Sequence, residues 1–272
     1  MKILIATGGS SHSEKALRFC AQLVQCGDEP PTVLTVVRNQ SEIAAGEAIL
    51  QRARAMLHDR PCAKTLVRVG RPAEQILAEA REGRYNLIIV GERQGYTLKT
   101  RVLGSTALRV IEHAACPVLI VRGEVRPIQR ILLCESGALT PSLHTRFTAQ
   151  LADVLQGQEE ITVLHVMSQF TAWPGVSDHD LVASAEELMA DHAPEGQWLV
   201  NDLQVLTRPD IQARPKVRHG TVVEEIMAEI EENAYDLVVI GAHRDAGWQR
   251  VLLENIAREI IRVVDRPLLI VR

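Results

Sequence analysis

The chain repeats the heptapeptide YNLIIVG of residues 85–91 as YDLVVIG at residues 235–241, an offset of 235 − 85 = 150. Both copies are almost uninterrupted apolar runs, rich in isoleucine and valine, that end in a glycine. A run of this kind is typical of a β-strand that is buried on both faces of a parallel sheet. The repetition therefore predicts two domains of similar fold, each built around one such strand.

Two further matches extend the repeat along the chain. The segment PVLIVR of residues 117–122 recurs as PLLIVR at residues 267–272, again at an offset of 267 − 117 = 150. Earlier in the chain, RFCAQL of residues 18–23 recurs as RFTAQL at residues 146–151, at an offset of 146 − 18 = 128. The second copy therefore carries about 150 − 128 = 22 additional residues between these matches.

We predict a first domain over residues 1–124 and a second domain over residues 125–272, because 272 residues are enough for two hydrophobic cores. The additional residues of the second copy fall within residues 168–215, which contain several prolines. We expect this region to be a long loop with one or two irregular helices, followed by a weak strand near residues 216–218.

Apolar runs alternate with amphipathic stretches in both copies. In the first copy we expect strands at residues 3–6, 33–37, 66–69, 87–90 and 118–121, and helices at residues 13–25, 41–58, 72–82 and 105–113. In the second copy we expect strands at residues 131–134, 161–166, 216–218, 237–240 and 268–271. This alternation predicts an α/β fold in which each domain is a five-stranded parallel sheet with helices on both faces. Ligands of such doubly wound sheets bind beyond the carboxyl ends of the strands.

Composition and charge argue against several classes of function. A formal net charge of −4 and a pI of about 6.2 leave no cationic excess, so we expect neither nucleic acid nor an anionic membrane as a partner. No segment has the length of a membrane span or the pattern of a signal peptide, and we expect a cytoplasmic protein. The five cysteines are dispersed without a Cys-x-x-Cys pair, which argues against a zinc site and a disulfide framework.

A glycine-bearing loop runs from Gly91 to Gly104 and enters a helix that begins at Ser105. Glycine lets phosphate oxygens approach backbone N–H groups, and a helix start offers unpaired N–H donors with partial positive charge. Arg93 and the other cations of the loop would add charge-assisted hydrogen bonds. On spacing alone, a phosphate loop and an ordinary loop before a capped helix are equally good interpretations.

Four segments of the first copy are more specific as a combination than any one of them alone. They are ILIA at residues 3–6 followed by Gly9-Ser10, LIIVG at residues 87–91, the loop from Gly91 to Gly104-Ser105, and CPVLIV at residues 116–121. Together they resemble the universal stress protein family. The resemblance implies two adenine-nucleotide alpha-hydrolase-like (Rossmann-like) domains whose last strands pair with each other. In one branch of the family it also implies ATP bound by a Gly-x-x-Gly-x9-Gly-Ser/Thr loop.

The resemblance further implies which residues contact an adenine nucleotide, whether ATP, ADP or AMP, with or without Mg²⁺. In this sequence these are Thr7 and Gly8 near the nucleoside, Val36 near the base, and Gly91, Arg93, Gly104, Ser105 and Thr106 near the phosphates. Two positions depart from the family pattern. The middle glycine of the loop is Gly95 while Gln94 occupies the expected position, and Gly8 replaces the acidic residue that the family has after its first strand.

The second copy departs further from the family loop. Glu254 and Asn255 stand where the first copy has Gly104 and Ser105. A carboxylate about 4 Å from a phosphate charge would cost on the order of 4 kcal/mol at an effective dielectric constant near 20. We therefore predict that the second domain does not bind ATP.

Polar residues elsewhere have structural interpretations. The run from Ser10 to Glu14 is explained by a helix cap rather than by a catalytic group. His113 and His165 are expected to be cap or core residues. His219 follows an expected strand, where a position facing the crevice and a solvated loop position are both open, with the loop preferred. We assign no catalytic residue and no metal site.

Three hypotheses for function follow. The leading one is a nucleotide-responsive stress regulator or protectant, in which ATP binding to the first domain changes the surface seen by a protein partner. The second is a nucleotide-independent interaction module acting through the second domain, which contains Trp173, Trp198 and Trp248. The third is slow ATP hydrolysis, for which Arg93 would stabilise phosphate charge although no base is visible. We also expect a pseudo-twofold monomer that is able to form a homodimer.

Overall fold

The computed structural model describes residues 1–24, 29–57, 63–92, 104–136, 141–155, 158–168, 183–241 and 248–271, without the side chains of Val24 and residues 248–254. The chain forms two compact units. The first comprises Met1–Pro127 together with Asp265–Ile270, and the second comprises Ile128–Val264 and the residues from Val271 onward.

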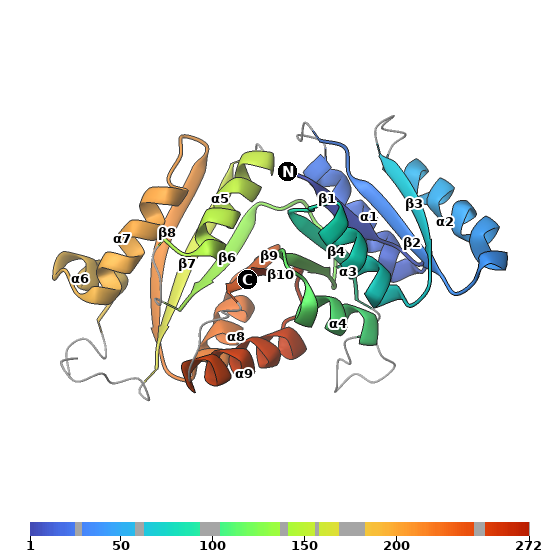
Figure 1. Cartoon of the computed structure of the whole chain (residues 1–272). Coiled ribbons are helices and arrows are strands. Elements are labelled where there is room, and N and C mark those ends of the chain that lie inside the picture. The colour runs from blue at the N-terminus through green and yellow to red at the C-terminus, as the bar shows by residue number, and fades with distance from the viewer. Residues whose placement is uncertain are drawn as a thin grey trace. The chain divides into compact units, whose positions relative to one another are not determined.

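The sheet of the first unit is doubly wound. Its strands are β1 (Ile3–Ala6), β2 (Thr32–Val37), β3 (Lys64–Val69), β4 (Leu87–Gly91), β5 (Val118–Val121) and β10 (Leu268–Val271), in the order β3-β2-β1-β4-β5-β10. Strands β1 to β5 are parallel, and the winding direction changes between β1 and β4. The helical elements of this unit are α1 (Ser11–Val24), η1 (Gln40–Glu42), α2 (Ile43–Met56), α3 (Pro72–Glu82) and α4 (Ser105–His113). Helices α1 and α2 pack together on one face and α3 and α4 on the other (Figure 1).

The sheet of the second unit repeats this plan. Its strands are β6 (Arg130–Glu135), β7 (Glu159–Met167), β8 (Ile211–His219) and β9 (Leu237–Gly241), all parallel and in the order β9-β6-β7-β8. The helices are α5 (Leu143–Leu155), α6 (Ala185–Ala190), α7 (Pro194–Leu206), α8 (Val222–Glu232) and α9 (Trp248–Val263). The predicted α/β fold with two Rossmann-like domains is confirmed.

The last strand of the second repeat, β10, groups with the first unit. It pairs antiparallel with β5, with Leu268 opposite Ile120 and Ile270 opposite Val118. The expected pairing of the last strands of the two repeats is therefore confirmed. As a result, the second unit keeps four parallel strands, and the first has five parallel strands plus one antiparallel strand.

The central strands are apolar on both sides because helices cover both faces of each sheet. Leu4, Ile88, Leu133 and Val238 have no exposed surface, and their neighbours along the strands are similarly buried. This burial is the dominant favourable term in forming each unit. None of the helices in the described segments combines the length and the apolarity that crossing a membrane requires.

Strand β8 differs from the sequence-based expectation. Residues 211–215 belong to a nine-residue strand rather than to a loop, and Pro215 lies in register opposite Val163. Proline is tolerated there because β8 ends the strand order of its sheet, and an edge strand does not need every N–H for pairing. The expected strand near residues 216–218 is therefore confirmed, but the expectation that residues 211–215 belong to a loop was wrong.

The inserted region of the second copy contributes two helices. Helix α7 packs against α5, β7 and β8, just as α2 packs against α1, β2 and β3 in the first unit. Helix α6 has no counterpart in the first unit and packs mainly on α7. Helix α7 thus takes the topological place of α2, and α6 is the added element.

Candidate functional site

The switch point of the first sheet brings the ends of β1 and β4 together. Ala6 lies opposite Val90, so Thr7 and Gly91 both come at the carboxyl edge of this strand pair. Thr7 is buried, and its Oγ1 accepts a hydrogen bond from the N–H of Gly9 at 3.3 Å. Three of the expected residues, Thr7, Gly8 and Gly91, are therefore gathered at this edge.

Space is open beside the backbone at Gly8. A Cβ built on Gly8 would meet no heavy atom of the described residues within 4 Å. At Gly9, in contrast, the backbone has φ +71° and a Cβ would lie 2.9 Å from Cγ1 of Ile49. The chain therefore turns at Gly9 and leaves room beyond the end of β1.

Gly91 has a structural role that does not depend on any ligand. A Cβ at this position would lie 2.3 Å from the carbonyl oxygen of His12, in the first turn of α1. Only glycine lets this turn approach the end of β4 so closely. The Gly91 position therefore brings helix α1 against the switch point.

Helix α4 begins with an open N-terminus. Gly104 is its N-cap residue and, being a glycine, supplies no capping side chain, and the first turn contains no acidic residue. The first intrahelical bond runs from the N–H of Leu108 to the carbonyl of Gly104 at 3.0 Å, so the preceding N–H groups have no intrahelical acceptor. Ser105 is exposed and Thr106 half-buried in this turn. Such a helix start attracts anions.

The remaining expected residues are placed only in part. Val36 is half-buried on β2, next to β1, and lies opposite Arg68 of β3. Arg93, Gln94 and Gly95 lie outside the described residues.

A buried ion pair at the same edge was missed by sequence reasoning. Nε of Arg122, the residue after β5, lies 3.3 Å from Oε2 of Glu92, the residue after β4, and their side chains are 1% and 5% exposed. The N–H of Glu92 also donates to the carbonyl of Val121 at 3.0 Å. The pair fixes the backbone where the loop begins. The recurrence of arginine at the end of PVLIVR and PLLIVR was a signal that could have pointed to it.

In the second unit, protein side chains fill the equivalent edge. A Cβ at Gly241, the end of β9, would lie 2.7 Å from Nδ1 of His144. At the end of β6, Oε1 of Glu135 accepts hydrogen bonds from the hydroxyls of Ser142 and Thr145, both at 2.6 Å, and lies 2.9 Å from Nε2 of His144. Burial opposes ionisation of Glu135, but His144 and the two hydroxyls outweigh it and lower the pKa of this carboxyl below its ordinary value.

The helix start that could bind an anion is also displaced in the second unit. Helix α9 begins at Trp248, so Glu254 and Asn255 lie inside it. Their backbone N–H groups are used within the helix. The structure therefore supplies a reason against phosphate binding at these positions that does not require the charge of Glu254.

Histidines and serines set aside by sequence reasoning have local partners. Ser10 Oγ accepts from the N–H of Ser13 at 3.4 Å at the start of α1, as expected for a cap. Nδ1 of His113 lies 3.0 Å from the carbonyl of Arg109, and Nδ1 of His165 lies 3.1 Å from that of Glu135. The preferred solvated position of His219 was wrong. This residue is half-buried, with Nε2 2.9 Å from the carbonyl of Ala183, because the inserted region covers the end of β8.

The structure describes the side chain of one of the three tryptophans. Trp198 is half-buried on α7 and packs edge-on against the His165 ring, with centroids 5.9 Å apart. Trp173 lies outside the described residues, and the side chain of Trp248 is not described.

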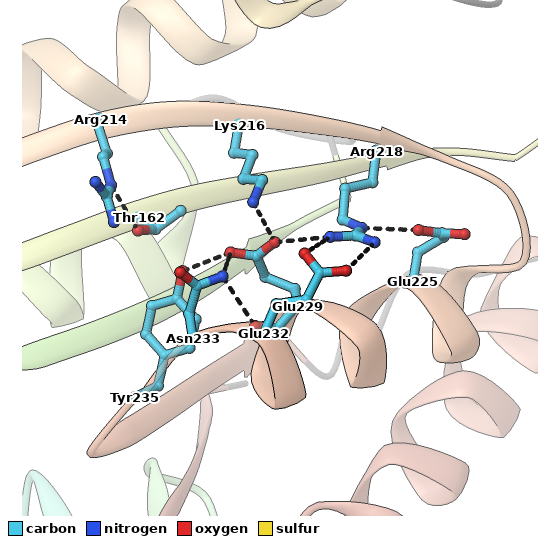
Figure 2. Close-up of polar contacts among 9 residues, drawn as sticks. All are labelled: Thr162, Arg214, Lys216, Arg218, Glu225, Glu229, Glu232, Asn233 and Tyr235. Atoms are coloured by element: carbon cyan, nitrogen blue, oxygen red, sulfur yellow. Dashed lines mark hydrogen bonds and ion pairs between the residues drawn. The ribbon is translucent and has the colours of Figure 1, made fainter.

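A network of charged residues joins β8 to α8 (Figure 2). Arg218 donates to Glu225, Glu229 and Glu232 at 2.7, 3.1 and 2.8 Å. Glu229, only 1% exposed, also pairs with Lys216 at 2.6 Å and accepts from the Tyr235 hydroxyl at 2.7 Å.

The first unit contains the same network 150 residues earlier. Arg68 pairs with Glu79 and Glu82, and the Tyr85 hydroxyl donates to Glu79 at 3.0 Å. Because it recurs in both units and its charges are paired within the protein, this network braces an outer strand to a helix and is not a ligand site.

The comparisons with known proteins agree with this fold. The sequence model of the Universal stress protein family matches residues 1–122 and again residues 141–272. Universal stress protein YxiE of Bacillus subtilis (strain 168) is 31% identical over 146 residues, which cover 44% of this chain and 98% of that protein. A universal stress protein of Mycolicibacterium smegmatis is 20% identical over 302 residues, covering 99% of this chain and 96% of that protein.

A solved structure extends the likeness to the whole chain. The crystal structure of a universal stress protein from Archaeoglobus fulgidus DSM 4304 has a TM-score of 0.76 at 18% identity, and the match covers 100% of this chain and 98% of that one. This likeness shows a shared fold. With two matches to the family model that together span most of its length, the chain belongs to the universal stress protein family and carries one family domain in each repeat.

Proposed function

We propose that the first unit binds an adenine nucleotide at the carboxyl ends of β1 and β4, and that the protein acts as a nucleotide-responsive stress regulator or protectant. The ligand is ATP, ADP or AMP, with or without Mg²⁺. Thr7 and Gly8 would lie near the nucleoside, Val36 near the base, and Gly91, Arg93, Gly104, Ser105 and Thr106 near the phosphates.

One observation carries this proposal, namely the difference between the two switch points. At the first, a Cβ on Gly8 would meet nothing in the described part of the chain within 4 Å, and α4 begins with a glycine N-cap and without an acidic first turn. At the second, Glu135 stands at the end of β6 where Thr7 stands after β1, and its carboxylate lies among Ser142, Thr145 and His144, while the equivalent of the α4 start lies inside α9. The first unit therefore fits a phosphorylated ligand and the second does not.

Binding rather than turnover is the claim. Slow ATP hydrolysis, in which Arg93 would stabilise phosphate charge, stays a secondary hypothesis. A protein partner, a homodimer and a cytoplasmic location also stay predictions.

Calorimetric titration of the whole chain with ATP, ADP and AMP tests the proposal. We expect binding of a single nucleotide per chain. Ser105→Glu, which puts a carboxylate at the start of α4, should weaken it about a hundredfold or more. The matched control is Asn255→Glu, at the equivalent exposed position of α9, which should leave affinity unchanged. Absence of binding at millimolar nucleotide, or equal effects of the two variants, would contradict the proposal.

A further inference from the structure

Asp202 is a buried carboxyl group in the second unit. It lies on α7, has no exposed surface, and neither of its side-chain oxygens has a hydrogen-bond partner in the part of the chain that the structure describes. An ionised carboxylate in such a place is costly, because burial removes its hydration.

The surroundings of Asp202 add to this cost. Glu135, at the end of β6, is held in its charged form by Ser142, Thr145 and His144 and repels a second negative charge on Asp202. Helix α7 packs on α5, α6, β7 and β8. The other titratable and charged residues of these elements are His144, Arg146 and Asp153 on α5, Glu159, Glu160 and His165 on β7, Arg214, Lys216, Arg218 and His219 on β8, Glu195 on α7, and Glu186 and Glu187, which α6 exposes to solvent.

Burial first, and then the charge of Glu135, raise the pKa of Asp202 to about 7, against weak opposition from Thr145, the Ser142 backbone and His144. The carboxyl group is therefore neutral in the closed structure at acidic pH and ionises near neutrality. When α7 moves away and exposes it, the group returns to its ordinary pKa of 3.8.

We propose that Asp202 is a proton-operated latch, whose protonated form holds α7 against α5 and the sheet and whose ionised form loosens α7. The device is separate from the proposed nucleotide site of the first unit. It would make the inserted region of the second unit, α6 and α7, responsive to pH.

The direction of the effect identifies the group responsible. A carboxyl group whose pKa is raised in the closed state makes opening easier as the pH rises from about 4 to about 7, and adds nothing further above that range. Burial lowers the pKa of His165, and the pKa of Glu135 is also lowered, so exposing either residue would make opening easier as the pH falls. Of Asp202, His165 and Glu135, only Asp202 therefore makes the opening of α7 more favourable as the pH rises.

Hydrogen exchange of the α7 amides in the intact chain tests the proposal, with rates corrected for the intrinsic pH dependence of exchange. The equilibrium constant for opening of α7 is measured in the wild type and in Asp202→Asn at each pH. The ratio of the two constants isolates the contribution of Asp202, because the histidines contribute equally to both. We expect this ratio to rise roughly 25-fold from pH 5.5 to pH 7.5, with a slope that approaches tenfold per pH unit below the midpoint. The control Asp210→Asn removes an exposed carboxylate just beyond α7 and should give a constant ratio.

A direct titration of the wild type keeps the proposal testable if Asp202→Asn does not fold. The carboxyl carbon of Asp202 is followed by NMR between pH 4 and pH 9 in the intact chain. A midpoint near neutrality supports the latch. A midpoint below pH 5, or an exchange ratio that does not change with pH, overturns it.

Discussion

The Cα atom of Gly123 lies directly against the carbonyl oxygen of Asp265. A Cβ on Gly123 would be only 2.2 Å from that oxygen, and the glycine has a φ of +65°. The contact lies just beyond the ends of the paired strands, since Gly123 follows β5 and Asp265 precedes β10. A side chain at position 123 would therefore push the backbone after β5 away from the backbone before β10, because the atom that it meets belongs to the main chain.

We predict that Gly123→Ala destabilises the first unit by at least about 1–2 kcal/mol, because it combines a left-handed backbone conformation with a backbone clash. Urea unfolding measures the loss, and hydrogen exchange in β10 should increase first. Gly8→Ala is the matched control, because a Cβ there meets none of the described atoms within 4 Å and the backbone is not left-handed. Equal stability of the two variants would contradict this account of the Gly123 contact.

Glu229 should make the second unit sensitive to acid. Burial tends to raise the pKa of this carboxyl, but Lys216, Tyr235 and Arg218 outweigh it and lower the pKa below the ordinary value of 4.5. Because the pKa is lowered in the folded state, the carboxylate stabilises the fold above about pH 4.5, and this contribution disappears as the pH falls through the lowered pKa.

Glu229→Gln should therefore lower the free energy of unfolding at pH 7 by about 1–3 kcal/mol and flatten its decline toward low pH. Denaturant unfolding from pH 7 down to pH 3 measures both effects. The control is Glu232→Gln, which removes a 55% exposed carboxylate bound to the same arginine and should change stability little. A Glu229→Gln protein as stable as the wild type at pH 7 would show that the network contributes no net stability.

The Glu92–Arg122 pair should behave as a coupled unit. Each side chain is almost fully buried, so Glu92→Gln or Arg122→Met alone removes one of two opposite charges and leaves the other one buried. Each single variant should lose about 3–5 kcal/mol. The double variant should recover part of that loss, because it buries neither charge.

A double-mutant cycle from urea unfolding measures this coupling. Strict additivity of the two single effects would mean that the charges do not compensate each other. The nucleotide affinity of the double variant, measured in parallel, reports whether the pair also positions the loop that starts after Glu92.

The sequence was most informative where burial is two-sided. The strand over residues 87–90 and its repeat over residues 237–240 are recognisable because parallel strands covered by helices are apolar at every position. Strand β8 escaped this reasoning. Arg214, Lys216 and Arg218 alternate along it toward α8, and Pro215 interrupts it, so its pattern is that of a loop although its pairing is that of a strand.

The sequence predicted the position of the candidate site in the sheet, but it did not predict the side chains that surround it. A switch point must lie at the ends of the first and fourth strands, which places Thr7 and Gly91 correctly. The side chains that fill the second crevice were not predictable. Asp202 is 202 − 135 = 67 residues from Glu135 in the sequence, so their proximity could not be predicted from spacing. A polar residue on an amphipathic helix is also normally expected on the exposed face, whereas Asp202 is buried.

The two obstacles to phosphate binding in the second unit can be separated with His144→Ala. This change removes the ring beside Gly241 and one of the partners of Glu135, so we expect a loss of about 2–3 kcal/mol in the stability of the second unit. It should not create an ATP site, because the backbone N–H groups of Glu254 and Asn255 remain bonded within α9. Calorimetry is best done in the Ser105→Glu background, where ATP binding by the first unit is weakened. Tighter ATP binding by this double variant than by Ser105→Glu alone would mean that the imidazole closes the second crevice and that the displaced start of α9 is no barrier.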